Sequence, residues 1–267
     1  MSLNRTACPT LSNSVFEMFS MKGKVTIITG ASGGIAAEIA KALAEAGSDL
    51  ALWYHNSTYA EELAKELTST YGIKAKTYKV DVKSWDQVNG GVTEVVKDFG
   101  KLDVMIANAG IPAKASCLDQ TLEEWHDVID TDFNGAYYCA RASGFVFQKQ
   151  GFGNLIFTAS MSAHIVNLPQ LQGCYNAAKA GVLHLSKSLA VEWKDFARVN
   201  SVSPGYIDTA ISGDCPADMK NQWFSKIPMG RDADPRELKG VYLYLASDAS
   251  TYTTGADFAV DGGYCAP

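Results

Sequence analysis

Short apolar runs alternate with longer amphipathic or alanine-rich stretches along most of this chain. The apolar runs are rich in β-branched and aromatic residues, which favours strands. They lie at residues 24–29, 49–53, 74–80, 103–107, 154–159, 198–203 and 257–260. Between them, helical periodicity is found at 34–46, 58–71, 84–99, 121–149, 174–196 and 235–246. Seven strands separated by helices predict an α/β fold, a doubly wound parallel sheet with helices on both faces.

The domain organisation follows from length and from the absence of breaks in the pattern. A chain of 267 residues can form one large α/β domain with an ample core. No linker, low-complexity segment or internal repeat interrupts residues 21–267, so we expect one catalytic domain there. Residues 1–20 form a polar N-terminal extension, in which Val15, Phe16 and Phe19 fit one face of a short helix. We expect this extension to lie against the body or against a neighbouring subunit.

Composition and charge exclude several classes of partner. The net charge of −6 disfavours nucleic acid and membrane surfaces as partners. No apolar run approaches the roughly 18 residues of a membrane span, and the amino terminus lacks the apolar core of a secretory signal. The six cysteines are scattered without a C-x-x-C pair, and the four histidines show no metal-binding spacing. We therefore expect a cytoplasmic protein with reduced thiols and no metal site.

Residues 154–181 carry the strongest chemical pattern. A buried strand, NLIFTA, ends near Ser160, and a helix begins near Cys174 after a loop. Tyr175 and Lys179 are four residues apart, so they share one helix face. A hydroxyl, a phenol and an ammonium at one sheet edge suit proton transfer to a carbonyl oxygen, and the ammonium would lower the pKa of the phenol. Alone, a Tyr–Lys pair at this spacing also fits an ordinary helix surface.

The first strand runs into a glycine-rich turn and then a helix. Thr29-Gly30-Ala31-Ser32-Gly33-Gly34 is followed by an alanine-rich helical stretch, an arrangement that presents backbone N–H groups and a helix N-terminus to a pyrophosphate. The alternative is a glycine turn without a ligand. Asn108-Ala109-Gly110 and Pro204-Gly205 follow two other strands at the same sheet edge. Ligands of open α/β sheets bind at this edge, which favours a dinucleotide site.

Taken together, these motifs resemble the short-chain dehydrogenase/reductase family. The ordered set is T-G-x-x-x-G, N-A-G, a serine before Y-x-x-x-K, and P-G followed by Thr209, and the likeness covers residues 20–267. The stretches WKDFARVNSVSPGYIDT and ASDASTYTTGADFAVDGGY are similar to the yeast and fungal branch of NADPH-dependent sorbose reductases, mannitol 2-dehydrogenases and carbonyl reductases. The resemblance implies a single-domain Rossmann fold, NADP(H) as the cofactor, and a homotetramer.

The resemblance also implies catalytic roles. Tyr175 would be the general acid in reduction, Lys179 would lower its pKa and bind the nicotinamide ribose, and Ser160 would position the carbonyl. Ser162 competes with Ser160, because the serine-to-tyrosine spacing is fifteen residues where thirteen is common in the family. Asp132 stands where the family has a fourth catalytic residue, an asparagine, and Asn134 lies two residues further on. We assign the fourth position to Asp132.

The predicted cofactor site spans several strand exits. Its predicted residues are Gly30, Ser32, Gly34, Ile35, His55, Asn56, Ser57, Asp81, Val82, Asn108, Ala109, Gly110, Tyr175, Lys179, Pro204, Gly205, Ile207 and Thr209. Ala36 replaces the family's third glycine. No carboxylate stands at positions 53–57, where an NAD-specific site usually has one, so we expect NADP(H). Asp81 has a second interpretation as a helix N-cap.

The substrate site is predicted from the loop between Ser160 and Tyr175 and from residues 206–230, the family's lid. Ser162, His164 and Trp223 are the predicted substrate contacts. His164, with Asn167 and Gln170, could instead satisfy the loop backbone, and Trp223 could be a core residue. The predicted reaction is reduction of a ketose or a small prochiral ketone to a secondary alcohol, reversible as polyol oxidation. The alternatives are reduction of a 3-oxoacyl thioester and a non-catalytic NADP-binding role.

Overall fold

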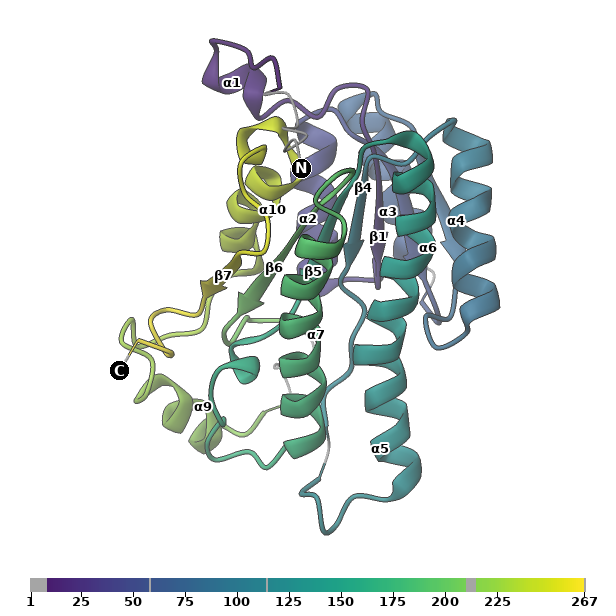
Figure 1. Ribbon diagram of the computed structural model, residues 1–267. Coiled ribbons are helices and arrows are strands. Elements are labelled where there is room, and N and C mark those ends of the chain that lie inside the picture. The colour runs from purple at the N-terminus through teal and green to yellow at the C-terminus, as the bar shows by residue number, and fades with distance from the viewer. Residues whose placement is uncertain (1–8, 58, 114, 210–214, 267) are drawn as a thin grey trace, which may run out of the picture.

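A computed structural model describes residues 9–57, 59–113, 115–209 and 215–266 (Figure 1). Its centre is one seven-stranded sheet in the order β3-β2-β1-β4-β5-β6-β7. The strands are β1 (Val25–Thr29), β2 (Asp49–Tyr54), β3 (Ala75–Lys79), β4 (Val104–Ala107), β5 (Asn154–Thr158), β6 (Arg198–Pro204) and β7 (Asp257–Val260). Every neighbouring pair is parallel, which confirms the predicted sheet.

Helices cover both faces of the sheet (Figure 1). Apolar side chains of α2 (Gly34–Glu45), α3 (Tyr59–Tyr71) and α10 (Lys239–Ala246) pack in the core on one face. Those of α4 (Trp85–Phe99), α6 (Gly135–Gln150) and α7 (Gly173–Glu192) pack in the core on the other. Because successive strand residues point to opposite faces, Ile27 belongs to one core and Ile28 to the other.

The strand order reverses between β1 and β4. The chain runs from β1 outward to β2 and β3, then returns to place β4 on the other side of β1. At such a switch point the two loops that leave the strand ends diverge and open a crevice at the carboxyl edge. The predicted motifs therefore come together at this edge.

The helix predicted over 121–149 is wrong in detail. The structure divides it into α5 (Leu122–Val128), the π-helical segment η1 (Ile129–Asn134) and α6. Thr121 begins α5 with a capping box to Glu124. A π turn holds an extra residue and often occurs at functional sites, and this one contains the buried Asp132.

The remaining elements are short. A 3₁₀ turn, η3 (Pro235–Leu238), precedes α10, and η4 (Asp248–Ser250) follows it. A further 3₁₀ turn, η2 (Met161–Ala163), follows β5, and α9 (Ala217–Phe224) lies within the predicted lid. Residues 210–214 of that predicted lid lie outside the described residues.

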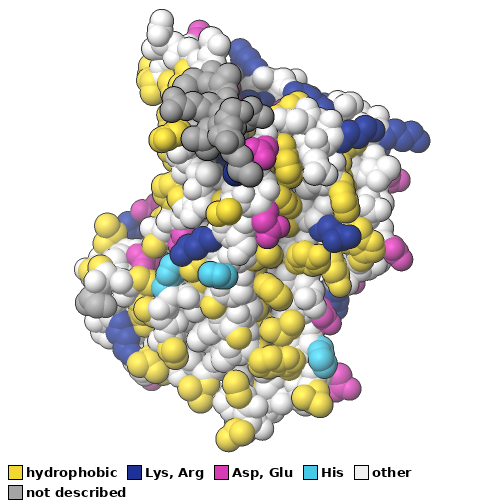
Figure 2. Space-filling view, viewed as in Figure 1, with side chains coloured by type: hydrophobic (Ala, Val, Ile, Leu, Met, Phe, Trp, Pro, Cys, Tyr) yellow, Lys and Arg dark blue, Asp and Glu magenta, His cyan; other side chains and the backbone are white. Residues whose placement is uncertain are grey.

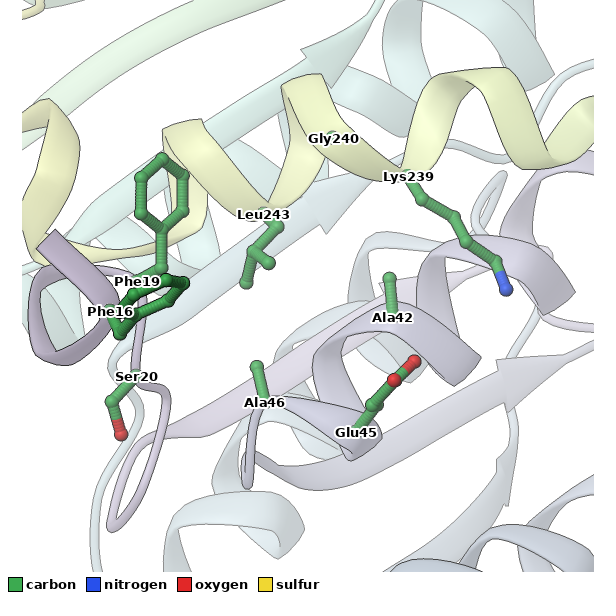
Figure 3. A pocket seen from close by; sticks show the side chains of 9 residues that line it. All are labelled: Phe16, Phe19, Ser20, Ala42, Glu45, Ala46, Lys239, Gly240 and Leu243. Atoms are coloured by element: carbon green, nitrogen blue, oxygen red, sulfur yellow. The ribbon is translucent and has the colours of Figure 1, made fainter.

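The N-terminal extension contains α1 (Val15–Met18), the helical turn predicted there. The Phe19 ring lies 6.4 Å from the Tyr244 ring of α10, and the Met21 N–H donates to the Ala46 carbonyl at 2.8 Å. Phe16 and Phe19 face a shallow groove whose other side is formed by the end of α2 and by α10 (Figure 3). The described part of the extension therefore packs on the face of the domain that carries α2 and α10.

The surface in Figure 2 mixes acidic, basic and apolar side chains. Exposed apolar residues include Leu122 and Trp125 of α5 and Phe145 of α6. Within the described ranges, no helix is both long and apolar enough to cross a membrane.

Candidate active site

One cavity of about 910 Å³ lies at the carboxyl edge of the sheet. Its walls come from the loops after β1, β4, β5 and β6, from α7 and from α9. It brings together a large part of the predicted site: Gly30, Ser32, Gly34, Ile35, Asn108, Ala109, Gly110, Asp132, Ser160, Ser162, Tyr175, Lys179, Pro204, Gly205, Ile207, Thr209 and Trp223. The cavity is large enough for a cofactor fragment and a small substrate together.

The glycine turn after β1 is shaped for close approach of a ligand. Gly30 has a φ of +68°, and a Cβ there would lie 3.1 Å from the Ala109 Cα. The Thr29 hydroxyl accepts hydrogen bonds from the N–H groups of Asn108 and Ala109, both at 2.9 Å, and so fixes the two strand exits relative to each other. The α2 N-terminus follows this turn and adds its positive end to the site.

Ala36, which stands where the family has its third glycine, is accommodated within the core. This side chain is 1% exposed and belongs to the apolar core that α2 shares with the sheet. The extra methyl therefore packs in place of the family's glycine, and the residues of the turn still line the cavity.

The residues predicted at the adenosine end are not among those that line the cavity. The His55 imidazole Nε2 lies 3.7 Å from the Asp81 carboxylate, and Val82 is buried against Gly135. The N-cap of α4 is Ser84, whose hydroxyl accepts from the Gln87 N–H at 3.4 Å, so Asp81 is not the helix cap. Asn56 and Ser57 follow β2, beside His55.

Tyr175 and Lys179 lie on one face of α7 and line the cavity with Ser160. The Lys179 Nζ lies 5.5 Å from the centre of the Tyr175 ring and donates to the Thr158 carbonyl at 3.0 Å. Thr158 is the last residue of β5, so the lysine joins α7 to that strand end. The predicted convergence of hydroxyl, phenol and ammonium is present.

Burial dominates the electrostatics of the phenol. It raises the pKa of Tyr175 above its ordinary value. The Lys179 ammonium and a hydrogen bond with Ser160 lower this pKa, whereas the Asp132 carboxylate raises it. The predicted lowering by Lys179 is therefore present but is outweighed, so the net direction differs from the prediction.

Asp132 is the partner of Lys179. Its carboxylate Oδ2 lies 3.2 Å from the Lys179 Nζ, and Oδ1 accepts from the Ile111 N–H at 2.8 Å. Asn134, the other candidate, donates to the Asp130 carboxylate at 2.7 Å. A Cβ at Gly110 would come within 2.7 Å of Asp132 Oδ2, so the last glycine of N-A-G makes room for the pair.

The charges of this pair support each other inside the protein. Burial lowers the pKa of Lys179, but Asp132 and Tyr175 raise it, and the net direction is upward. Burial also raises the pKa of Asp132, and it outweighs Lys179 and the Ile111 N–H, which act to lower it, so the net direction is again upward. Because the two groups are in contact, their titrations are coupled, and each apparent pKa describes the pair and not one residue alone.

Ser160 and Ser162 are hydrogen-bonded neighbours, and both are buried in the cavity wall. The Ser160 hydroxyl donates to the Ser162 hydroxyl at 3.1 Å. The Ser162 hydroxyl donates to the Asn167 carbonyl at 2.6 Å and accepts from the Gln172 amide at 3.2 Å. Ser162 is thus tied into the loop, whereas Ser160 is the serine that acts to lower the pKa of Tyr175.

Polar side chains form one wall of the cavity beside these serines. The Gln170 side-chain carbonyl accepts from the Tyr206 hydroxyl at 3.0 Å and from the Trp223 indole at 2.7 Å. Asn167 donates to the Tyr206 hydroxyl at 3.4 Å. We did not predict Tyr206 or Gln172, although Tyr206 directly follows the Pro204-Gly205 motif that marked this strand exit.

His164 is directed elsewhere, and its predicted substrate contact is not supported. Its Nε2 lies 2.8 Å from the Asp257 carboxylate of β7, and His164 is not among the residues that line the cavity. Asp257 also accepts from the hydroxyls of Ser201 and Ser203, at 2.6 and 2.9 Å. The histidine therefore joins η2 to β6 and β7.

Metal ligation finds no support in the described ranges. No group of three or more His, Cys, Asp or Glu side chains there is arranged to hold a metal ion. Five cysteines of that part of the chain are free thiols: Cys117, Cys139, Cys174, Cys215 and Cys265. Cys8 lies outside the described residues.

A family model described as enoyl-(acyl carrier protein) reductase matches residues 30–265. The match spans the glycine turn, the Ser160–Tyr175–Lys179 site and β7. The chain belongs to the short-chain dehydrogenase/reductase family. Similar structures agree, since a crystal structure of NADPH-dependent 3-quinuclidinone reductase from Rhodotorula rubra superposes with a TM-score of 0.94 at 47% identity, covering 98% of each chain.

Curated members of the family are similar along almost the whole chain. A probable NADP-dependent mannitol dehydrogenase from Yarrowia lipolytica is 57% identical over 98% of this chain and 95% of its own length. A sorbose reductase from Candida albicans is 51% identical over 98% of this chain and 94% of its own length. The predicted family and branch are thereby confirmed.

Proposed function

We propose that this protein is an NADP(H)-dependent reductase that converts the ketone of a ketose, such as sorbose or fructose, to a secondary alcohol. The reverse reaction oxidises a polyol. The observation that carries the proposal is one cavity holding the Tyr175–Lys179 pair beside a wall of hydrogen-bonding side chains. The relatives named mannitol dehydrogenase and sorbose reductase support it.

The residues of the site divide the chemistry between them. NADPH, when bound, supplies the hydride that reduces the carbonyl carbon. Tyr175 donates its phenolic proton to the carbonyl oxygen, and Ser160 holds that oxygen by a hydrogen bond. Lys179, anchored by Asp132 and Thr158, keeps a positive charge beside the phenol and is available to the cofactor ribose. In polyol oxidation the same phenol, deprotonated, accepts the hydroxyl proton.

The polar wall favours a hydroxylated substrate. Ser162, Asn167, Gln170 and Tyr206 offer hydroxyl and amide groups that a polyol chain can bond. Because these groups already bond to one another, an apolar acyl chain would add no hydrogen bond to them, whereas the hydroxyls of a polyol can donate to the lone pairs that they keep. Trp223 provides the apolar surface of the pocket, and a small prochiral ketone can lie against it.

Reduction of a 3-oxoacyl thioester is the second candidate, because the matching family model is named after a reductase of another acyl thioester, an enoyl-(acyl carrier protein) reductase. It would use the same tyrosine and lysine. A non-catalytic role has less support, since both residues stand in the cavity.

Cofactor binding is proposed along the glycine turn and the neighbouring strand exits. Gly30, Ser32, Gly34 and Ile35 would hold the pyrophosphate, and Asn108–Gly110, Pro204, Gly205, Ile207 and Thr209 the nicotinamide half. His55, Asn56 and Ser57 would meet the 2′-phosphate, with Asp81 and Val82 near the adenine. The next acid along the chain, Glu61, accepts a hydrogen bond from the Tyr54 hydroxyl at 3.3 Å.

A substrate panel tests the proposal. NADPH oxidation would be followed with D-fructose, L-sorbose, 3-quinuclidinone and an acetoacetyl thioester at matched concentrations. We expect the ketoses to give the highest kcat/KM. A preference for the thioester would favour the second candidate, and no turnover with any carbonyl compound would contradict the proposal.

We also propose a homotetramer located in the cytoplasm. The exposed apolar side chains of α5 and α6, Leu122, Trp125 and Phe145, support a subunit contact there. The free thiols support a reducing compartment. Light scattering should give four times the 28.7 kDa of one chain, and cell fractionation should recover the protein with cytosolic markers.

A further inference from the structure

The ion pair between Asp132 and Lys179 is buried beside the reacting phenol. The side chains of Asp132 and Lys179 are 0% and 4% exposed, and the two charged atoms are 3.2 Å apart. Asp132 belongs to η1 and Lys179 to α7, so the pair also joins two elements that pack directly against each other. The carboxyl group at this point is an ionisable partner for the ammonium, where the family's asparagine would be neutral.

The geometry leaves the lysine little freedom. An ammonium group has three donors. One reaches the Thr158 carbonyl at 3.0 Å, and the Asp132 Oδ2, 3.2 Å from the Nζ, holds the ammonium as an ion-pair partner without an aligned hydrogen bond. Asp132 is held in turn by the Ile111 N–H at 2.8 Å, so neither partner can turn away without breaking a buried hydrogen bond.

The charges around the phenol come from few elements. Lys179 on α7 and Asp132 on η1 act on Tyr175, and Ser160 after β5 contributes a neutral hydroxyl. Asp127 of α5 acts on Asp132 from further away. The phenol therefore faces a cation and an anion that lie 3.2 Å apart, and the field of the anion opposes that of the cation.

We propose that Asp132 is a positioning residue that fixes the Lys179 ammonium and offsets its charge, so that Tyr175 remains a proton donor into alkaline solution. The inference rests on the proposed function, in which a protonated phenol serves ketone reduction and an ionised phenol serves polyol oxidation. The site is thereby biased toward reduction at neutral pH, and oxidation requires alkaline pH.

The sign of the effect follows from the two protonation states. Asp132→Asn keeps the shape and removes the anion, so ionised Tyr175 is no longer repelled and Lys179 loses its counter-charge. The first proton should then leave the Lys179–Tyr175 pair at lower pH. A charge within about 4–6 Å of a titrating group shifts its titration by about 1–3 pH units.

The test compares the wild type with Asp132→Asn and with Asp130→Asn, a matched control. Asp130 lies on the same π segment but pairs with Asn134. The Asp130→Asn variant therefore removes the same charge without changing a partner of Lys179. We would measure kcat/KM against pH for ketose reduction and for polyol oxidation. In Asp132→Asn, the alkaline fall of reduction and the rise of oxidation should both move to lower pH by about 1–3 units. Asp130→Asn should overlay the wild type.

A spectroscopic titration separates this inference from the proposed function. Phenolate absorbance would be titrated without cofactor, and each protein would be compared with its own Tyr175→Phe derivative. The absorbance difference between each protein and its Tyr175→Phe derivative reports Tyr175 alone. It should titrate at lower pH in Asp132→Asn, even if none of the carbonyl compounds tested is the true substrate. Asp132→Ser, which keeps an oxygen for the Ile111 N–H, should move in the same direction if Asp132→Asn does not fold.

Three results would overturn the inference: titration and pH profiles of Asp132→Asn that overlay the wild type, an equal shift in Asp130→Asn, or a loss of rate at all pH values without a shift. The last would leave Asp132 a purely structural role.

Discussion

The Trp223 indole lies flat against the Tyr206 ring, with centroids 4.2 Å apart and planes 9° from parallel. The Gln170 side chain bonds to the polar atoms of both rings. A third ring, Tyr264 near the carboxyl terminus, meets Tyr206 edge-on at 5.9 Å. The lid helix α9 is therefore attached to the loop after β5 and to the C-terminal segment through one aromatic stack.

Replacing Trp223 with phenylalanine tests this attachment. The stack would largely remain, while the indole N–H that bonds to Gln170 would be lost. One hydrogen bond contributes about 0.5–1.5 kcal/mol, so KM for the ketose should rise about two- to tenfold with a smaller change in kcat. Trp125→Phe, on the exposed surface of α5, is the control. An unchanged KM in Trp223→Phe would separate the lid from substrate binding.

The two buried serines should differ when each is replaced with alanine. Ser160→Ala removes the hydroxyl that we propose holds the substrate oxygen, so kcat should fall by about 10- to 100-fold. Ser162→Ala should act chiefly on KM, because that hydroxyl is occupied by Asn167 and Gln172. Steady-state kinetics with one ketose would decide. A larger loss of kcat in Ser162→Ala would reverse the assignment.

Cofactor preference should depend on residues 55–57. No carboxylate, Arg or Lys stands at 53–57, so neutral donors alone would bind the 2′-phosphate. Hydrogen bonds to a charged group contribute about 1.5–3 kcal/mol each, which favours NADPH over NADH by about ten- to a hundredfold in kcat/KM. Asn56→Asp combined with Ser57→Asp should repel the phosphate and shift preference toward NADH.

The control for that variant is Ser69→Asp combined with Thr70→Asp, the same charge change at the exposed end of α3. Direct binding of 2′,5′-ADP and of ADP by calorimetry gives a second readout. Equal use of NADH and NADPH by the wild type, or an unchanged preference in the Asn56/Ser57 variant, would refute this account of cofactor choice.

Chelation should leave the reaction unaffected. In the part of the chain that the structure describes, no cluster of ligands for a metal is present, and the proposed proton transfer needs none. The rate in the presence of EDTA should equal that in its absence during a short assay. Inactivation that zinc or magnesium reverses would require a metal in the mechanism.

The strand exits were predictable from the sequence because they depend on local periodicity. NLIFTA is recognisable as a buried strand that ends at Ser160, and Tyr175 and Lys179 are recognisable as residues of the first turns of the helix that follows. The carboxyl edge of the sheet then brings these three residues together. The strands fall within one residue of their predicted bounds for the same reason.

Features that depend on tertiary contacts were not predictable in this way. The apolar pattern of 121–149 runs unbroken through the π segment, so nothing local indicates the turn that directs Asp132 to Lys179. His164 is bonded to Asp257, 93 residues away, and the loop sequence alone could not distinguish that partner from a substrate. The net rise of the Tyr175 pKa likewise comes from burial, which emerges only when the fold is complete.

The most direct test of the central claim is a single-turnover measurement with a ketose and pre-bound NADPH, comparing the wild type with Tyr175→Phe. The substitution keeps the aromatic ring and removes only the proton donor. General acid catalysis contributes about 10²–10⁴-fold, so the rate should fall by that factor while NADPH affinity, followed by fluorescence, stays within about twofold. Tyr137→Phe, a partly exposed tyrosine on α6, should keep the wild-type rate. If Tyr175→Phe retained more than about a tenth of the wild-type rate, Tyr175 would not be the acid and the proposed mechanism would be wrong.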